Sequence, residues 1–135
     1  MSKPTVLLAD DHPNFFEIIE NLLGGIYEIV GRVSDGQALV EAAIKLRPDV
    51  IVTDIWMPVL DGIEAVRRLK ESGNNSKVFF LSVHADPDFA RACLLYGASG
   101  YVVKARMATD LKPTIKAALA GQTFASSSLH FQIGS

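Results

Sequence analysis

Five polar side chains follow short apolar runs in the sequence, and together they could bind a metal ion and transfer a phosphoryl group. They are Asp10, Asp11, Asp54, Ser82 and Lys104. Three carboxylates in one cleft repel one another, by about 4 kcal/mol for two charges 4 Å apart at an effective dielectric near 20. A hard divalent cation such as Mg²⁺ relieves this repulsion, because it prefers oxygen ligands and keeps positions open for phosphate oxygens. One Mg²⁺ and the lysine would balance the three negative charges.

Asp54 is the residue of this group that could act as a nucleophile, since aspartyl phosphates are established covalent intermediates. Lys104 and a metal would stabilise the equatorial oxygens of the transferred group, and Ser82 would donate a hydrogen bond to the product phosphoryl. Each residue alone is also a common cap, turn or loop residue. The hypothesis therefore depends on a fold that brings all of them into one cleft.

The elements that would position these residues are five strands and five helices. Apolar runs rich in β-branched residues alternate with segments of helical periodicity, which is typical of a parallel sheet covered by helices. The expected strands are 6–9, 28–33, 50–53, 78–81 and 101–103. The expected helices are 14–23, 36–46, 62–72, 86–96 and 109–120. Pro113 removes a hydrogen bond in the first turns of the last helix, so we expect that end to be irregular. Ligands bind at the carboxyl ends of the strands in such sheets, where these polar residues lie.

The composition narrows the class of protein. A length of 135 residues suits one domain. The balance of 13 Lys and Arg against 15 Asp and Glu argues against a nucleic-acid-binding chain. The single Cys93 leaves no disulfide or multi-cysteine zinc site, and we expect it to pack as an inert side chain. No apolar run approaches the ~18 residues that span a bilayer, and no signal peptide is evident, so we expect a cytoplasmic protein without membrane contact.

The order of these motifs resembles the response-regulator receiver domain of bacterial two-component signalling. The resemblance runs from about Val6 to Phe124. It rests on the five polar residues above, on residues 57–62 (Met-Pro-Val-Leu-Asp-Gly) and on residues 100–104 (Gly-Tyr-Val-Val-Lys). It implies a flavodoxin-like, doubly wound, five-stranded parallel sheet of order 2-1-3-4-5 with helices on both faces. We expect the receiver domain to occupy residues 1–125, followed by a C-terminal tail or the start of a linker at 126–135.

The resemblance also implies which residues bind metal and phosphate. Asp54 would be the phosphoacceptor. Asp11, Asp54 and the backbone carbonyl of Trp56 would be ligands of a Mg²⁺ cofactor, and Asp10 would hold a metal-bound water.

A second group of residues would change conformation or contacts when Asp54 is phosphorylated. Ser82 matches the switch hydroxyl, Tyr101 matches the aromatic residue whose rotamer follows phosphorylation, and Lys104 matches the lysine that pairs with the phosphoryl group. Three positions depart from the commonest pattern of the family, and one of them is Trp56, two residues after Asp54. Ala105 follows the lysine where many receivers have a proline, and the bulky Val83 follows the switch hydroxyl where Ala or Gly is frequent.

Residues 10–13 (Asp-Asp-His-Pro) and 120–124 (Ala-Gly-Gln-Thr-Phe) resemble the receivers of NarL/FixJ-type (LuxR-type) transcription factors. The implied partners are a sensor histidine kinase or a small phosphodonor, and a second copy of the chain in a phosphorylation-dependent homodimer. The DNA-binding output domain of that subfamily has no room within 135 residues. We therefore also consider a stand-alone receiver that acts through protein contacts, with Leu95 and Tyr96 of the helix 86–96 as part of its surface.

Other classes of phosphate or metal site fit these residues less well. A flavin-binding loop would not be acidic, as residues 10–13 are, and a phosphate-loop NTPase needs a glycine-rich loop ending in Lys-Ser or Lys-Thr. A haloacid-dehalogenase-type phosphatase needs a second acid two residues after its nucleophile, where this chain has Trp56. A zinc site that adds His12 and His84 to the carboxylates is a minor alternative. We expect the chain to catalyse only its own phosphorylation and dephosphorylation, and an aspartate-nucleophile phosphohydrolase is the enzyme alternative.

Overall fold

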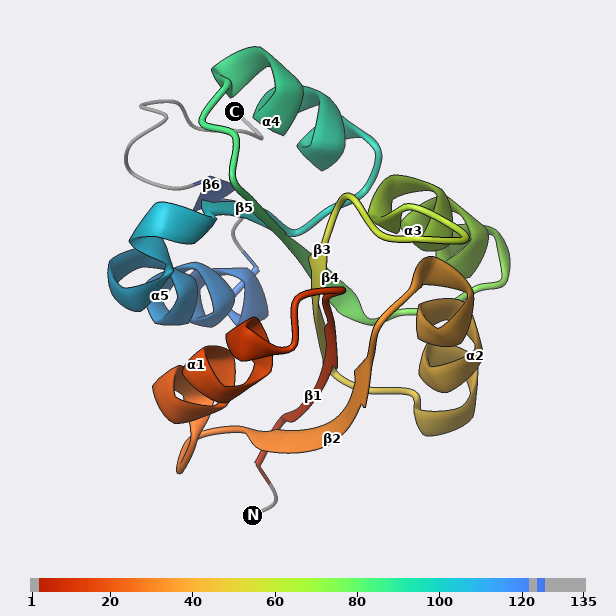
Figure 1. Cartoon of the computed structure of the whole chain (residues 1–135), viewed down its shortest axis with the longest axis horizontal. Helices are drawn as coiled ribbons and strands as arrows, with labels where there is room; N and C mark the ends of the chain where they lie inside the picture. Colours follow the sequence, from red (N-terminus) through yellow and green to blue (C-terminus); the bar gives the residue numbers. More distant parts are fainter. Residues whose placement is uncertain (1–2, 122–123, 126–135) are drawn as a thin grey trace.

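A six-stranded parallel sheet forms the centre of the protein in our computed structural model, which describes residues 3–121 and 124–125 (Figure 1). The strand order is β2-β1-β3-β4-β5-β6, and every neighbouring pair is parallel. The strands are β1 (Thr5–Ala9), β2 (Glu28–Val33), β3 (Val50–Asp54), β4 (Lys77–Ser82), β5 (Gly100–Val103) and β6 (Phe124–Ala125). The doubly wound α/β class and the order 2-1-3-4-5 predicted for the first five strands are confirmed.

A short sixth strand, β6, lies at the edge of the sheet beyond the five predicted strands. It extends the sheet by pairing Gly100 with Phe124 and Tyr101 with Ala125. A strand of two residues has no apolar run, which is the signal that identified the other strands. The tail or linker expected at 126–135 lies outside the described residues.

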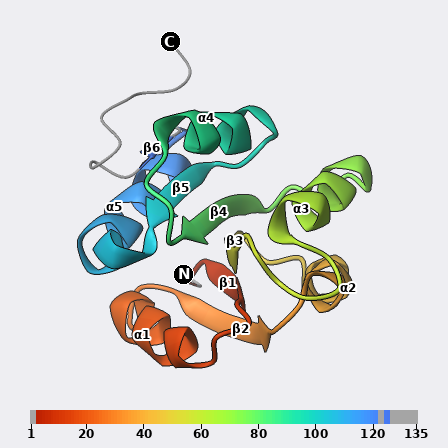
Figure 2. The same ribbon diagram turned by 45° about the horizontal axis from the view of Figure 1, so that its top comes forward.

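Helices cover both faces of the sheet (Figures 1 and 2). They are α1 (Asn14–Leu23), α2 (Gly36–Leu46), α3 (Gly62–Glu71), α4 (Pro87–Leu95) and α5 (Met107–Leu119), with a 3₁₀ turn η1 (Lys104–Arg106) before α5. Buried side chains of α2, α3 and α4 share one half of the core, and those of α1 and α5 share the other. Successive residues of a strand point into opposite halves of the core. Leu7 packs in the half formed with α2, α3 and α4, and Leu8 packs in the half formed with α1 and α5. Both faces of the central strands are therefore buried.

The last helix begins two residues earlier than the sequence predicted, at Met107 rather than Thr109. Thr109 is not the cap, since α5 follows directly on η1 and its first turn has no side-chain cap. Pro113 lies inside α5 and not at its start. The irregularity expected from Pro113 is therefore not found at the start of α5, and the 3₁₀ turn η1 that precedes this helix begins at Lys104.

Cys93 is buried on α4, in the half of the core shared with α2 and α3. Burial raises the pKa of its thiol to about 11. Because the thiolate is the reactive form, this environment favours inert packing. Among the helices of the described residues, none combines the length and apolar character needed to cross a membrane.

Val59, in the loop between β3 and α3, has a left-handed backbone with φ of 69°. A β-branched residue is strained in this conformation, whereas glycine is not. The side chain is 81% exposed, so little packing is lost on its removal. We predict that Val59→Gly raises the free energy of unfolding by about 1 kcal/mol, measured by urea denaturation.

Val83→Gly is the matched control for this prediction, because Val83 is 68% exposed and its φ is not positive. There the added freedom of the unfolded chain should lower the free energy of unfolding. A Val59→Gly protein that unfolds at a lower urea concentration than the wild type would show that this loop is not strained.

Candidate functional site

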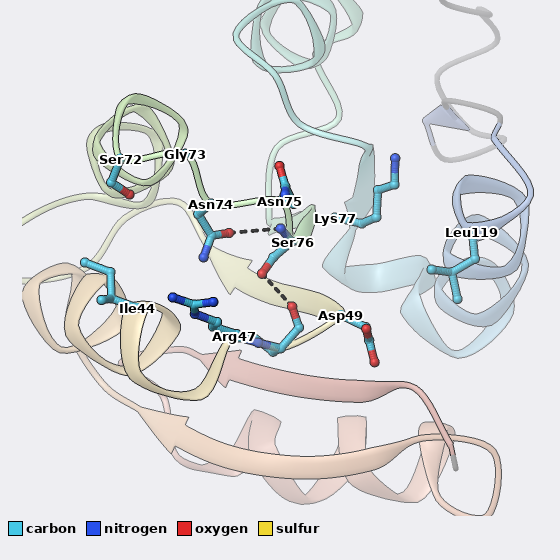
Figure 3. Close-up of a pocket in the computed structure, with 11 residues that line it drawn as sticks. Ile44, Arg47, Asp49, Ser72, Gly73, Asn74, Asn75, Ser76, Lys77 and Leu119 are labelled. Carbon is cyan, nitrogen blue, oxygen red and sulfur yellow. Dashed lines mark hydrogen bonds between the residues drawn. The ribbon is translucent and has the colours of Figure 1, made fainter. Parts of the chain in front are cut away.

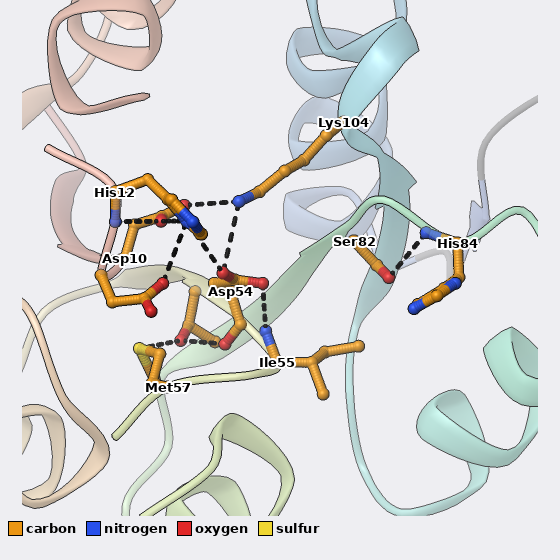
Figure 4. Close-up of polar contacts among 10 residues, drawn as sticks. Asp10, His12, Asp54, Ile55, Met57, Ser82, His84 and Lys104 are labelled. Atoms are coloured by element: carbon orange, nitrogen blue, oxygen red, sulfur yellow. Dashed lines mark hydrogen bonds and ion pairs between the residues drawn. The ribbon is translucent and has the colours of Figure 1, made fainter. Parts of the chain in front are cut away.

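The carboxyl ends of β1, β3 and β5 bring Asp10, Asp54 and Lys104 together, as the topology predicted (Figure 4). The Lys104 ammonium Nζ lies 3.0 Å from Asp10 Oδ2 and 3.3 Å from Asp54 Oδ2. All three residues are buried. Nζ also lies 4.0 Å from the centroid of the Phe15 ring on α1, a cation–π contact that covers another side of the ammonium. Sequence analysis missed Phe15, whose only signal was its place on the apolar stripe of α1.

Asp11 and His12 complete an acidic cluster with Asp10 and Asp54, in which one possible ligand atom of each lies within 4.8 Å of all the others. Asp11 Oδ1 is a buried carboxylate oxygen that accepts no hydrogen bond, whereas Asp10 Oδ2 is paired with the Lys104 ammonium. Buried anionic oxygens without donors are unfavourable unless a cation lies near them. The oxygen-rich donor set therefore fits a hard divalent cation such as Mg²⁺.

The loop that carries Asp54 is held by backbone contacts. The Ile55 N–H donates to Asp54 Oδ1 at 2.8 Å, and the Gly62 N–H donates to the Ile55 carbonyl at 2.6 Å. A Cβ atom at Gly62 would lie 2.4 Å from the Asp54 carbonyl oxygen, so only glycine permits this approach. Burial raises the pKa of the Asp54 carboxyl, while Lys104 lowers it and the Asp10 charge raises it further.

His12 lies beside the carboxylates of the cluster, and its side chain is 63% exposed to solvent. Its ring Nδ1 lies 3.2 Å from Asp10 Oδ1, 3.0 Å from Asp11 Oδ1 and 3.9 Å from Asp54 Oδ2. His84 is not part of the cluster among the described residues. The position of His12 directly after two aspartates was the one sequence signal for this contact.

Ser82, Tyr101 and Trp56 form a second group of predicted site residues, linked through the His84 backbone and through Phe89. Ser82 and Tyr101 are fully buried, and both bond to the backbone of His84: Ser82 Oγ accepts from its N–H at 3.1 Å, and the Tyr101 hydroxyl donates to its carbonyl at 2.9 Å. Trp56 is half-exposed, and its indole stacks on Phe89 of α4 at 6.2 Å. The Phe89 ring in turn meets Tyr101 edge-on at 6.3 Å. A continuous row of aromatic rings thus joins the loop after Asp54 to α4 and β5.

A separate hollow of about 530 Å³ lies at the opposite, amino-terminal ends of β3 and β4 (Figure 3). Arg47 and Lys77 line it, but its buried polar side chain is already paired. The Ser76 hydroxyl donates to the Pro48 carbonyl at 2.6 Å, and the Ser76 N–H donates to Asn74 Oδ1 at 2.9 Å. No unpartnered buried group of the described residues points to a ligand there.

The sequence model of the response regulator receiver domain matches residues 6–116, which include every residue of the cluster. The chain belongs to this family. As a receiver domain, it is 35% identical over 125 residues to the transcriptional regulatory protein DegU of Brevibacillus brevis, covering 91% of this chain and 53% of that protein. It is 32% identical over 127 residues to the nitrate/nitrite response regulator protein NarL of Escherichia coli K12, covering 93% and 59%.

Solved structures agree with this membership. A two-component response regulator of the LuxR family from Aurantimonas superposes with a TM-score of 0.89 at 29% identity, covering 98% of this receiver chain and 96% of that one. The receiver chain spans only about half to three-fifths of the length of DegU and NarL.

Proposed function

We propose that this receiver domain accepts a phosphoryl group on Asp54 and uses it to switch a signalling surface. The observation that carries the proposal is the position of Asp54. Its carboxylate is buried at the end of a central strand, within 3.3 Å of the Lys104 ammonium and beside the carboxylates of Asp10 and Asp11. This arrangement offers a carboxylate nucleophile next to groups that can balance a phosphoryl charge.

The transfer would exchange one phosphorus bond for another. One carboxylate oxygen of Asp54 attacks the phosphorus of a donor, either a phosphohistidine of a sensor histidine kinase or a small acyl phosphate. The bond between phosphorus and the donor breaks, and an acyl phosphate forms on Asp54. Lys104 would pair with the phosphoryl oxygens, exchanging its contacts with carboxylates for contacts with the new anion.

Asp11, Asp54 and the Trp56 backbone carbonyl would hold Mg²⁺, with Asp10 accepting a hydrogen bond from a metal-bound water. When bound, the ion supplies positive charge that offsets the oxygens of the incoming phosphoryl group. The buried Asp11 Oδ1, which accepts no hydrogen bond, supports this assignment.

Ser82 and Tyr101 would transmit the change. Ser82 lies at the end of β4, beside β3, and its hydroxyl would turn from the His84 N–H to the phosphoryl group. Burial raises the pKa of Tyr101 and a hydrogen bond with Ser82 lowers it, and both side chains bond to the backbone of His84. Movement of Ser82 would therefore alter the Tyr101 ring and, through Phe89, the position of α4.

The relatives suggest what the switch controls. DegU is a transcriptional regulatory protein and NarL is a nitrate/nitrite response regulator. We propose that this receiver controls a DNA-binding output in the cytoplasm, through phosphorylation-dependent homodimerisation, without binding nucleic acid itself. Action through protein contacts alone is the second candidate, favoured by the exposed Leu95 and Tyr96 at the end of α4.

Acetyl phosphate tests the proposed chemistry directly. Incubation with acetyl phosphate and Mg²⁺ should add one phosphoryl group per chain in intact-mass spectra, and chelation of the metal with EDTA should prevent it. A phosphohydrolase would instead turn over an added phosphate ester continuously without retaining the group. Absence of any adduct under conditions that phosphorylate a known receiver would contradict the proposal.

A further inference from the structure

The ring nitrogen of His12 occupies a position that suits a metal ligand. Ligands about 2.1 Å from an octahedral ion lie about 3.0 Å apart when adjacent and about 4.2 Å apart when opposite. His12 Nδ1 lies 3.0 Å from Asp11 Oδ1 and 3.9 Å from Asp54 Oδ2. One ion could therefore contact all three atoms with small movements of the side chains.

The backbone of His12 holds the ring near the cluster while leaving it free to adjust. The His12 N–H donates to Asp10 Oδ1 at 2.8 Å, which fixes the turn after β1. The ring meets Phe15 edge-on at 6.1 Å, and the side chain is 63% exposed. The carboxylates thus lie on the buried side of the cluster, and the imidazole lies on its open side.

We propose that His12 is a metal ligand of this receiver and makes its cation site select first-row transition metals such as Ni²⁺ over Mg²⁺. The proposal rests on the cation site of Asp11 and Asp54 proposed above. Carboxylate oxygens suit Mg²⁺, whereas an imidazole nitrogen adds affinity for Ni²⁺, Cu²⁺ and Zn²⁺. The buried Asp11 Oδ1, which accepts no hydrogen bond, is the second sign that the cluster accommodates a cation.

A competing role for His12 makes a different prediction. If the imidazole only donates hydrogen bonds to the carboxylates, it competes with every divalent cation for the same oxygens. Its removal would then strengthen the binding of Mg²⁺ and Ni²⁺ alike. If the imidazole is a ligand, its removal weakens Ni²⁺ binding and leaves Mg²⁺ binding nearly unchanged.

His12→Phe is the informative variant, because it keeps an aromatic ring beside Phe15 and removes the nitrogen. By calorimetry at pH 8, it should bind Ni²⁺ at least about tenfold more weakly than the wild type. Its affinity for Mg²⁺ should change by less than about twofold. His12→Asn should behave in the same way, so the result does not depend on one substitution. His84→Phe is the matched control and should leave both affinities unchanged.

Electron spin echo spectra of the Mn²⁺-loaded protein give a readout that does not depend on affinity. A coordinated imidazole should produce ¹⁴N modulation in the wild type and in His84→Phe, and the modulation should disappear in His12→Phe. Unchanged Ni²⁺ affinity, or modulation that persists without His12, would overturn the assignment of His12 alone. A wild-type protein that binds neither Mg²⁺ nor Ni²⁺ would overturn the cation site and this inference together.

Discussion

Asp54→Asn should abolish phosphoryl uptake from acetyl phosphate and Mg²⁺ while leaving the fold intact. The amide is a far weaker nucleophile than the carboxylate, so no acyl phosphate can form at this position. The amide oxygen can still accept the Ile55 N–H bond, now 2.8 Å long, and the side chain keeps its size. Intact-mass spectra should show no adduct, and circular dichroism should be unchanged.

The same substitution should not lower the stability of the metal-free protein at pH 7. Burial raises the pKa of the Asp54 carboxyl, Lys104 lowers it and Asp10 raises it, with a net upward shift. An acid whose pKa is higher in the folded than in the unfolded state stabilises the fold at pH values below the unfolded pKa. This contribution is lost as the pH rises through the folded pKa. At pH 7 the ionised Asp54 therefore destabilises the fold, whereas the neutral amide of the variant would not. Asp54→Asn should melt at or above the wild type, and the difference should shrink below about pH 4.

Asp61→Asn is the matched control for both measurements. Asp61 also follows β3 in the sequence, but its side chain caps α3 by accepting the Glu64 N–H at 2.8 Å. Asparagine is an equally good N-cap, so this variant should fold and should still take up a phosphoryl group. An undiminished adduct on Asp54→Asn, with its position mapped to another residue, would show that Asp54 is not the acceptor.

Much of the site could be predicted because it depends on where strands end. Asp10, Asp54, Ser82 and Lys104 each end or follow an apolar run, and parallel strands place such residues at one edge of the sheet. These side chains lie together because of the order of the strands, and the strands and helices can be recognised by the periodic spacing of their apolar residues.

The features that could not be predicted from the sequence depend on the local path of single segments between the strands and the helices. His12 and Phe15 reach the cluster because the chain turns into α1 directly after Asp11, and no periodicity encodes the direction of that turn. The start of α5 was misplaced because it lacks a capping side chain. The left-handed backbone of Val59 was not predicted either, since glycine or asparagine is the usual sequence signal for that conformation.

Lys104→Met should strongly destabilise the metal-free protein. The Lys104 ammonium is the cation that contacts both Asp10 and Asp54, at 3.0 and 3.3 Å, and its removal leaves two buried carboxylates uncompensated. Removal of one partner of a buried ion pair destabilises a protein by about 3–5 kcal/mol. For a domain of this size, the melting temperature should fall by about 10–20 °C, measured by calorimetry in EDTA.

Two further measurements separate this electrostatic effect from simple loss of packing. Without the ammonium, Mg²⁺ meets less repulsion, so the increase in melting temperature on adding Mg²⁺ should be larger than in the wild type. The double variant Lys104→Met/Asp10→Asn should recover part of the lost stability, because it removes one of the uncompensated charges. Beryllofluoride, an anionic phosphoryl mimic, should bind more weakly to Lys104→Met even with Mg²⁺ present.

Lys112→Met, which replaces an exposed lysine of α5, is the control and should change neither the melting temperature nor ion binding appreciably. The opposite signs for Mg²⁺ and beryllofluoride are the decisive part of the prediction, because a partly unfolded site would bind both more weakly. If Lys104→Met has the same melting temperature as the wild type in EDTA, the ammonium does not compensate the charges of the carboxylates. If it also binds beryllofluoride as well as the wild type does, Lys104 has no part in holding the phosphoryl group.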